Sequence, residues 1–171
     1  YVGGGLFRST DGGENWYSIS NEIDNIGVFV LKISAAGDVY AGTLQSIYKS
    51  TDQGITWNKV DSSYPTNGYA EEIAFDLSGN IYVPNAYSGV YKSTNGGNSW
   101  TLYSNGLPSS MYVRRIEFTS NNILLVSDLY RGIYKSTDFG VNWTQSNTGL
   151  DSTYYVTSFN SNSSGEIFIS T

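Results

Sequence analysis

One eleven-residue segment occurs four times and constrains the fold more than any other feature of the chain. It reads IYKSTDQGITW from Ile47 to Trp57, and similar segments span 6–16, 90–100 and 133–143. These segments hold all four tryptophans, which are separated by 41, 43 and 43 residues. A nearly constant period in this range indicates small supersecondary units that stack on their neighbours.

Each segment carries the residues of a tight hairpin turn. An apolar, an aromatic and a basic residue come first and favour a strand. An Asp can then accept hydrogen bonds from the following backbone N–H groups, and a Gly two residues later permits a positive φ. The Trp three residues after the Gly begins the return strand, and we expect it to pack between its own hairpin and an adjacent sheet. The predicted structural positions are Ser9, Asp11, Gly13, Trp16, Ser50, Asp52, Gly54, Trp57, Ser93, Asn95, Gly97, Trp100, Ser136, Asp138, Gly140 and Trp143.

The segment resembles the Asp-box, or BNR, repeat of sialidases and related β-propellers, whose pattern is Ser-x-Asp-x-Gly-x-Thr-Trp. Four units match, and the departures are Asn95 in place of Asp and the variable residues before Trp. In those families the box is a structural device on the face away from the active site. The resemblance therefore implies that Asp11, Asp52 and Asp138 maintain the fold, and that the protein is secreted or exposed at a cell surface.

The chain lacks two residue types that often bind metals or act in catalysis. It contains no cysteine and no histidine, which excludes disulfides, thiolate metal sites, imidazole catalysis and histidine ligands. We therefore expect no metal and no cofactor. A net charge of −6 argues against a nucleic-acid partner, and no apolar run approaches the ~20 residues of a membrane span. Because the first residue is Tyr1 and not Met, we expect the chain to be part of a longer precursor.

The stretches between successive Trp residues repeat one order of predicted strands. A short segment follows each Trp, then a polar loop, then two strands joined by a turn, and then the strand that carries the next box. Only 69–75 offers a helical alternative, and its alignment with the other units outweighs its local propensity. Four antiparallel strands per ~40 to 45 residues form the blade of a β-propeller. The predicted fold is all-β, with about four blades' worth of chain and units at 28–60, 69–103 and 112–146.

The two ends of the chain hold complementary parts of one further blade. Residues 1–19 begin with what reads as the end of a second strand, Tyr1-Val2-Gly3, and carry a box without its inner strands, whereas 155–171 supply an inner pair without a box. We expect one blade composed of both parts, within one chain, between two copies, or with other parts of a longer polypeptide. The single chain would make a four-bladed ring and a homodimer an eight-bladed ring. Asp-box propellers generally have six or more blades, so the resemblance favours the last two arrangements.

The loops that enter the inner strands and those between second and third strands are the predicted ligand-binding surface, because loops on rigid scaffolds often carry function. Aromatic faces with amides and carboxylates suit a sugar, whose ring stacks and whose hydroxyls form hydrogen bonds. The alternative is that these are ordinary solvated residues. The candidates are Glu22, Asp24, Tyr64, Asn67, Asn85, Tyr87, Asp128, Tyr130, Arg131 and Asp151.

Opposite charges also occupy equivalent positions of neighbouring inner strands. Aligning these strands on the following turn places Glu71 level with Arg114 and Glu72 level with Arg115. These pairs are candidates for recognising a polar ligand in the central channel. The alternative is an ion pair between blades that satisfies its own charges.

Catalytic motifs of the related enzymes do not emerge from the sequence. A sialidase would require an arginine triad, a Tyr–Glu pair and an Asp acid, but Arg8 belongs to a box, and Arg114 and Arg115 point to opposite faces of a strand. An inverting xyloglucan hydrolase needs two carboxylates with a water between them, and no motif nominates the pair. The segments NGLP (105–108) and TGL (148–150) resemble propellers of bacterial surface and secreted proteins and of photosystem assembly factors.

The sequence thus favours a noncatalytic binding or scaffold module that recognises carbohydrate or protein. Two alternatives stay open: part of a sialidase-like or xyloglucanase-like glycoside hydrolase whose catalytic residues lie partly outside this chain, and a protein-assembly factor.

Overall fold

The computed structural model describes residues 5–20, 23, 27–44, 46–60, 63–64, 69–150 and 155–171. All sixteen elements in these ranges are strands, which form three four-stranded and two two-stranded antiparallel sheets. The prediction of an all-β fold is confirmed. The one segment with a helical alternative is also extended and leads into strand β7 (Ala74–Phe75).

The three complete blades each contain four consecutive strands in sequence order. Successive strands pair through short connections, so each blade is a meander that runs from an inner to an outer strand. The first blade has β3 (Val28–Ile33), β4 (Val39–Thr43), β5 (Ile47–Ser50) and β6 (Asn58–Lys59); the second has β7, β8 (Ile81–Asn85), β9 (Gly89–Ser93) and β10 (Thr101–Tyr103); the third has β11 (Val113–Phe118), β12 (Leu124–Asp128), β13 (Gly132–Ser136) and β14 (Thr144–Gln145).

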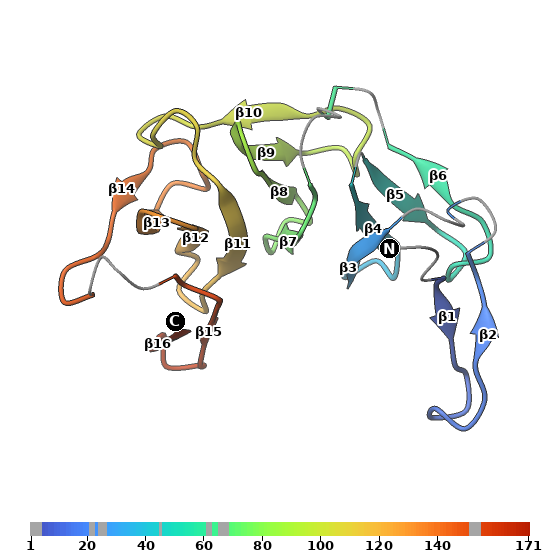
Figure 1. The fold of residues 1–171 in the computed structure, drawn as a ribbon. Coiled ribbons are helices and arrows are strands. Elements are labelled where there is room, and N and C mark those ends of the chain that lie inside the picture. Colours follow the sequence, from blue (N-terminus) through green and yellow to red (C-terminus); the bar gives the residue numbers. More distant parts are fainter. Residues whose placement is uncertain are drawn as a thin grey trace.

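Two incomplete units flank these blades. The N-terminal hairpin pairs β1 (Phe7–Arg8) with β2 (Tyr17–Ser18), and the C-terminal hairpin pairs β15 (Ser158–Ser161) with β16 (Ile167–Ser170). Figure 1 shows an arc with inner strands on the concave side and these hairpins at opposite ends. They form separate sheets at the two ends of the arc, so this structure does not close a four-bladed ring. The other two ways of completing the divided blade stay predictions.

The hydrophobic core lies between the blades. Each of the four buried clusters combines side chains from two consecutive units, such as Tyr82 of the second blade with Val113 and Trp143 of the third. Equivalent clusters join the first and second blades, the N-terminal hairpin and the first blade, and the third blade and the C-terminal hairpin. Each unit is therefore stabilised by its nearest neighbours, as in other repeat proteins.

The four tryptophans show this dependence on neighbours. Trp57, Trp100 and Trp143 are buried as predicted, and the indole Nε1 of Trp57 donates to the carbonyl of Ile19 in the preceding unit (2.8 Å). The prediction is wrong for Trp16, which is 63% exposed. The physical reason is that burial of the indole depends on a neighbouring unit, and none of the described residues covers Trp16.

Candidate functional site

The meander of each blade gives the arc two faces with different chemistry. Because the strands are antiparallel, the Asp-box turns between third and fourth strands lie at the same end as the turns between first and second strands. The loops between second and third strands and the connections between blades lie at the other end, which we call the loop face. The predicted binding residues of the loops are therefore separated from the Asp boxes by the length of a strand.

The Asp-box turn is held by a set of local hydrogen bonds. In the second box, Ser50 Oγ donates to Asp52 Oδ1 (2.7 Å) and accepts from the N–H of Gly54 (2.7 Å). The same carboxylate accepts from the N–H (2.9 Å) and the hydroxyl (2.6 Å) of Thr56. The side-chain bond from Thr56, followed by the bonds from its N–H and from Ser50, lowers the pKa of Asp52 to about 2.

The other carboxylate boxes repeat this geometry. Asp11 accepts from the N–H and the side-chain amide of Asn15, and Asp138 does so from Asn142. The side-chain bond from Asn15 comes first in lowering the pKa of Asp11 to about 2, and the backbone bond from Asn142 comes first in lowering that of Asp138. These carboxylates are engaged within their own turns, in agreement with a structural role.

Asn95 keeps the same turn with one hydrogen bond reversed. Its Oδ1 accepts from Ser93 Oγ (3.0 Å) and from the N–H of Ser99 (2.9 Å), as an Asp would. Its Nδ2, however, donates to the Ser99 hydroxyl (2.9 Å), which becomes the acceptor. A hydroxyl can play either part, so the uncharged box is satisfied because residue 99 is Ser.

The loop face carries tyrosine pairs that repeat with the blades. Tyr87 meets Tyr112 edge to face, with ring centroids 5.9 Å apart, and Tyr130 meets Tyr155 in the same manner at 6.0 Å. In each pair the first ring lies between second and third strands of one unit, and the other enters the inner strand of the next. Tyr87, Tyr130 and Tyr155 are exposed, so their faces are open to a ligand. We call these four residues the tyrosine row.

An ion pair lies close to the first pair of the tyrosine row. Arg114 Nε is 3.0 Å from Glu71 Oε2, which confirms the predicted contact between these inner strands. Burial, followed by the negative charge of Glu71, raises the pKa of the Tyr112 phenol. Arg114 stands at a register shift of β11, so that it reaches the preceding unit.

The second predicted charge pair does not form. Glu72 instead contacts Lys32 of the first blade (Nζ to Oε1, 3.0 Å), and Arg115 Nε donates to the carbonyl of Thr157 (3.1 Å). The two residues are level, but adjacent side chains on a strand point to opposite sides. Glu72 therefore faces the preceding unit while Arg115 faces the following one.

Other predicted binding residues serve the scaffold in the structure. Tyr64 is buried and packs edge to face on Tyr91 and Trp100, so its ring is unavailable to a ligand. Asp128 is also buried: its carboxylate accepts from the N–H groups of Tyr112 (2.7 Å) and Tyr130 (2.8 Å).

Two further candidates from the same loops belong to turns and interfaces of the scaffold. Arg131 lies 3.6 Å from Asp128 and donates to the carbonyl of Ser110. Asn85 is buried and accepts from the N–H of Tyr87 (3.1 Å). The predictions for Glu22, Asp24, Asn67 and Asp151, and for Tyr1-Val2-Gly3, concern residues outside the described part of the chain.

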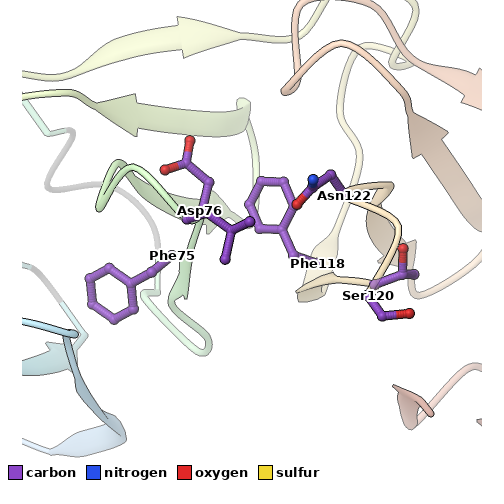
Figure 2. A pocket seen from close by; sticks show the side chains of 7 residues that line it. Phe75, Asp76, Phe118, Ser120 and Asn122 are labelled. Carbon is purple, nitrogen blue, oxygen red and sulfur yellow. The ribbon is translucent and has the colours of Figure 1, made fainter. Parts of the chain in front are cut away.

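A pocket of about 260 Å³ lies on the Asp-box face, between the inner hairpins of the second and third blades. Figure 2 shows Phe75 and Asp76 on one side and Phe118, Ser120 and Asn122 on the other. The carboxylate of Asp76 accepts from the N–H groups of Ser78 and Asn80, the Asn80 side chain and the Tyr82 hydroxyl. It is therefore a turn cap, and the pocket offers little polar chemistry of its own.

The structure also adds residues that sequence reasoning missed. Tyr112 and Tyr155 complete the tyrosine row, and their spacing of 43 residues, equal to that of Tyr87 and Tyr130, is the signal that could have found them. Among the described residues no group of three His, Cys, Asp or Glu side chains could hold a metal ion. The same residues contain no helix long and apolar enough to cross a membrane.

Comparison with known proteins supports the assignment of the sheets as β-propeller blades. Residues 48–59 match the family model of the BNR/Asp-box repeat. A search of curated proteins finds no match. Among solved structures, the chain is similar to the GH74 xyloglucanase from Xanthomonas campestris, with 20% identity, a TM-score of 0.68, and coverage of 82% of this chain and 26% of that chain.

Two further structures share the fold. YCF48 bound to D1 peptide has 20% identity and a TM-score of 0.58, with 81% of this chain and 46% of that chain covered. PorZ, a surface component of the type-IX secretion system of Porphyromonas gingivalis, has 14% identity and a TM-score of 0.75, with 98% and 28% covered. The chain thus spans between about a quarter and a half of these proteins. It is built of BNR/Asp-box repeats that fold as blades of a β-propeller.

Proposed function

We propose that this chain is a noncatalytic binding module of a secreted or surface protein, and that its loop face binds carbohydrate through the tyrosine row. The observation that carries the proposal is the repetition of an exposed edge-to-face tyrosine pair in successive units, Tyr87 with Tyr112 and Tyr130 with Tyr155. A scaffold role does not require such rings to be exposed, because the buried aromatics already fill the spaces between blades.

The chemistry of the row suits a neutral oligosaccharide. Exposed phenol rings offer apolar faces to the C–H face of a sugar, and their hydroxyls both donate and accept hydrogen bonds. The half-exposed guanidinium of Arg114, fixed by Glu71, adds donors beside Tyr112. Two equivalent pairs in adjacent units fit a ligand that itself repeats, such as a polysaccharide.

The carboxylates near the row support a binding role over hydrolysis. Asp128 accepts two backbone hydrogen bonds and is buried, and Glu71 is paired with Arg114. Glycoside hydrolysis requires one free carboxylic acid and a second carboxylate across the scissile bond. In the described part of this face, neither group is placed to serve as such an acid.

A glycan-binding experiment tests the proposal. Xyloglucan, other β-glucans and sialylated glycans are presented to the purified chain, and the affinity for any bound glycan is measured by calorimetry. Tyr87→Ala and Tyr130→Ala are expected to weaken binding by ~10-fold each, the loss of roughly 1.4 kcal/mol of stacking. Tyr17→Ala, on the exposed outer strand β2, is the matched control and should bind as the parent does.

Two results would contradict the proposal. One is glycan binding that survives the double change Tyr87→Ala and Tyr130→Ala. The other is release of reducing ends from a bound glycan that stops when Asp128 is replaced by Asn, because this would indicate a glycoside hydrolase.

The second candidate function is recognition of a protein segment, as in an assembly factor. The Arg114–Glu71 pair favours it, because a fixed guanidinium beside tyrosines also suits an acidic or carboxyl-terminal peptide. YCF48 carries a peptide on the same fold. A peptide library screened in parallel distinguishes the two, since peptide binding lost in Arg114→Ala with no glycan bound would favour the protein partner.

A further inference from the structure

The junction between the second and third blades places an acidic and a basic side chain together at the loop-face end of the inner strands. We propose that Glu71 and Arg114 jointly recognise two adjacent hydroxyl groups of a neutral sugar ring, and so select glycans that carry a free vicinal diol. This inference rests on the proposed function, because it concerns the same face and names the part of a glycan that is recognised there. Both units that meet at this junction are complete four-stranded blades.

The two charged residues occupy the same position at the entry of successive inner strands. The segments 69–71 and 112–114 read Tyr-Ala-Glu and Tyr-Val-Arg. In both, the middle residue is buried and the residues on either side of it are half-buried. Since side chains alternate along an extended chain, the Tyr and the charged residue both project away from the core. Each member of the ion pair is thus preceded by a tyrosine that is partly open to solvent.

The ion pair uses only part of the hydrogen-bonding capacity of its two members. Arg114 Nε lies 3.0 Å from Glu71 Oε2. Within the described part of the chain, neither the Nη groups of Arg114 nor Oε1 of Glu71 forms a further hydrogen bond. The arginine side chain is 41% exposed and the glutamate side chain 18%, so both are accessible to a ligand. The pair therefore offers N–H donors and a carboxylate acceptor side by side.

A neutral ligand with two adjacent hydroxyls matches this pair. One hydroxyl can donate to Glu71 Oε1 while its neighbour accepts from an Nη group of Arg114, and both bonds are charge-assisted. A carboxylate ligand fits less well, because Glu71 already neutralises the guanidinium and would repel a second negative charge at short range. The exposed ring of Tyr87, which meets Tyr112 edge to face, adds an apolar surface for the sugar ring.

Equivalent positions nearby lack this arrangement. At the next level of the same strands, Glu72 and Arg115 bond separately, to Lys32 and to the carbonyl of Thr157. At the entry of β15 the position of Arg114 is taken by Thr157, whose hydroxyl bonds to Ser170. One sugar of a bound chain is therefore recognised by the charged pair, and its neighbours are held by stacking on the tyrosine row.

Two glucans built from the same sugar test the inference. Internal rings of a β-1,4-glucan have free hydroxyls at C2 and C3, whereas internal rings of a β-1,3-glucan have no two adjacent free hydroxyls. Soluble polymers of each kind are titrated into the purified chain by calorimetry. The parent should bind the β-1,4-glucan at least ~10-fold more tightly, as expected for a charge-assisted hydrogen bond.

Conservative variants separate selection from affinity. Glu71→Gln replaces the free acceptor by a donor, and Arg114→Lys keeps the charge but loses the planar set of donors, so each should reduce the preference to less than ~3-fold. Tyr87→Ala should weaken both glucans by the same factor and preserve the preference. Glu72→Gln is the matched control, since Glu72 lies on the same strand, is equally accessible (19%) and is also ion-paired, and its loss should leave the preference unchanged.

The outcomes distinguish this inference from the proposed function. Equal binding of the two glucans by the parent, or a preference that survives in both Glu71→Gln and Arg114→Lys, overturns the inference and leaves glycan binding by the tyrosine row in place. Binding confined to acidic glycans has the same consequence. If the parent binds no glycan, the inference and the proposed function both fail, whether or not a peptide binds. The comparison of glucans in the parent requires no variant, so it stands even if a variant fails to fold.

Discussion

The first and second Asp boxes have the same turn but opposite surroundings. In both, the Ser hydroxyl lies 2.7 Å from the Asp, and the fourth residue after the Asp donates twice to its carboxylate. Yet Trp16 is 63% exposed and Trp57 only 4%. The comparison shows that the turn is specified within eleven residues, whereas burial of the indole is supplied by the preceding unit.

Replacing the tryptophan should give the largest difference in stability between the two boxes. Trp57→Ala removes a buried indole and its bond to Ile19 and should cost ~3–5 kcal/mol, as other large core truncations do. Trp16→Ala in the monomer should change the free energy of unfolding by less than ~0.5 kcal/mol. Urea unfolding below the concentration of any self-association measures both, and equal losses would refute the idea that neighbours supply burial.

Replacing Gly106 and Gly149, which follow the third and fourth boxes, should give a smaller difference in stability. Gly149→Ala introduces only the strain of a side chain at positive φ, about 1 kcal/mol. Gly106→Ala adds an overlap with the backbone of Trp143 and should cost roughly 1–3 kcal/mol more. The same unfolding experiment compares them, and a Gly149 variant as unstable as the Gly106 variant would show that this terminal unit is covered in the monomer.

Acid should affect the two boxes alike, because the pKa depends on the turn and not on the Trp. Asp11 and Asp52 each have a pKa lowered to about 2 from an ordinary value of 3.8. A lowered folded pKa gives stability that is complete above the unfolded value and is lost as pH falls towards the folded value. Stability should therefore decline between pH 4 and 2, and Asp11→Asn and Asp52→Asn should reduce this decline equally. Thermal unfolding across this range is the measurement, and a change seen in only one variant would contradict the expectation.

The smallest predicted difference is in the melting temperatures of two variants, Asp52→Asn and Asp138→Asn, whose boxes belong to complete blades. Asp52→Asn leaves a hydroxyl, Thr56, which can accept from the new amide as Ser99 accepts from Asn95. Asp138→Asn instead faces the donating amide of Asn142, whose oxygen already accepts from Asn105 of the preceding unit. At neutral pH, Asp138→Asn should lower the melting temperature more than Asp52→Asn. The additional change Asn142→Ser should restore part of the loss.

Local features of this fold could be predicted from the sequence because the repeat fixes them. The boxes, the order of strands and the Glu71–Arg114 contact follow from aligning units of 41 to 43 residues. Contacts between side chains of different units were harder, since they depend on direction as well as level. Lys32 forms an ion pair with Glu72 because its long side chain reaches the next inner strand. The sequence alignment could not predict this pair, since it does not place the two residues at the same level.

Exposure was the other property that the sequence could not supply. Tyr64 and Tyr87 are both loop tyrosines, but Tyr64 packs against Trp100 while Tyr87 remains at the surface. Trp16 and Trp57 have the same local sequence pattern, but Trp16 is exposed and Trp57 is buried against the unit before it. In a repeat protein the burial of a residue depends on its neighbouring unit, which the residue's own segment does not encode.

The local character of the Asp-box bonds has a kinetic consequence. The bonds that define a box join residues two to four positions apart, so little chain entropy opposes their formation. The indole contacts join residues 38 apart, as between Trp57 and Ile19. We therefore expect hairpins to form first and blades to dock afterwards, so that refolding kinetics should give higher φ-values at Ser50 than at Trp57. A chain of preformed hairpins can then assemble from any pair of adjacent units, and folding need not begin at one end.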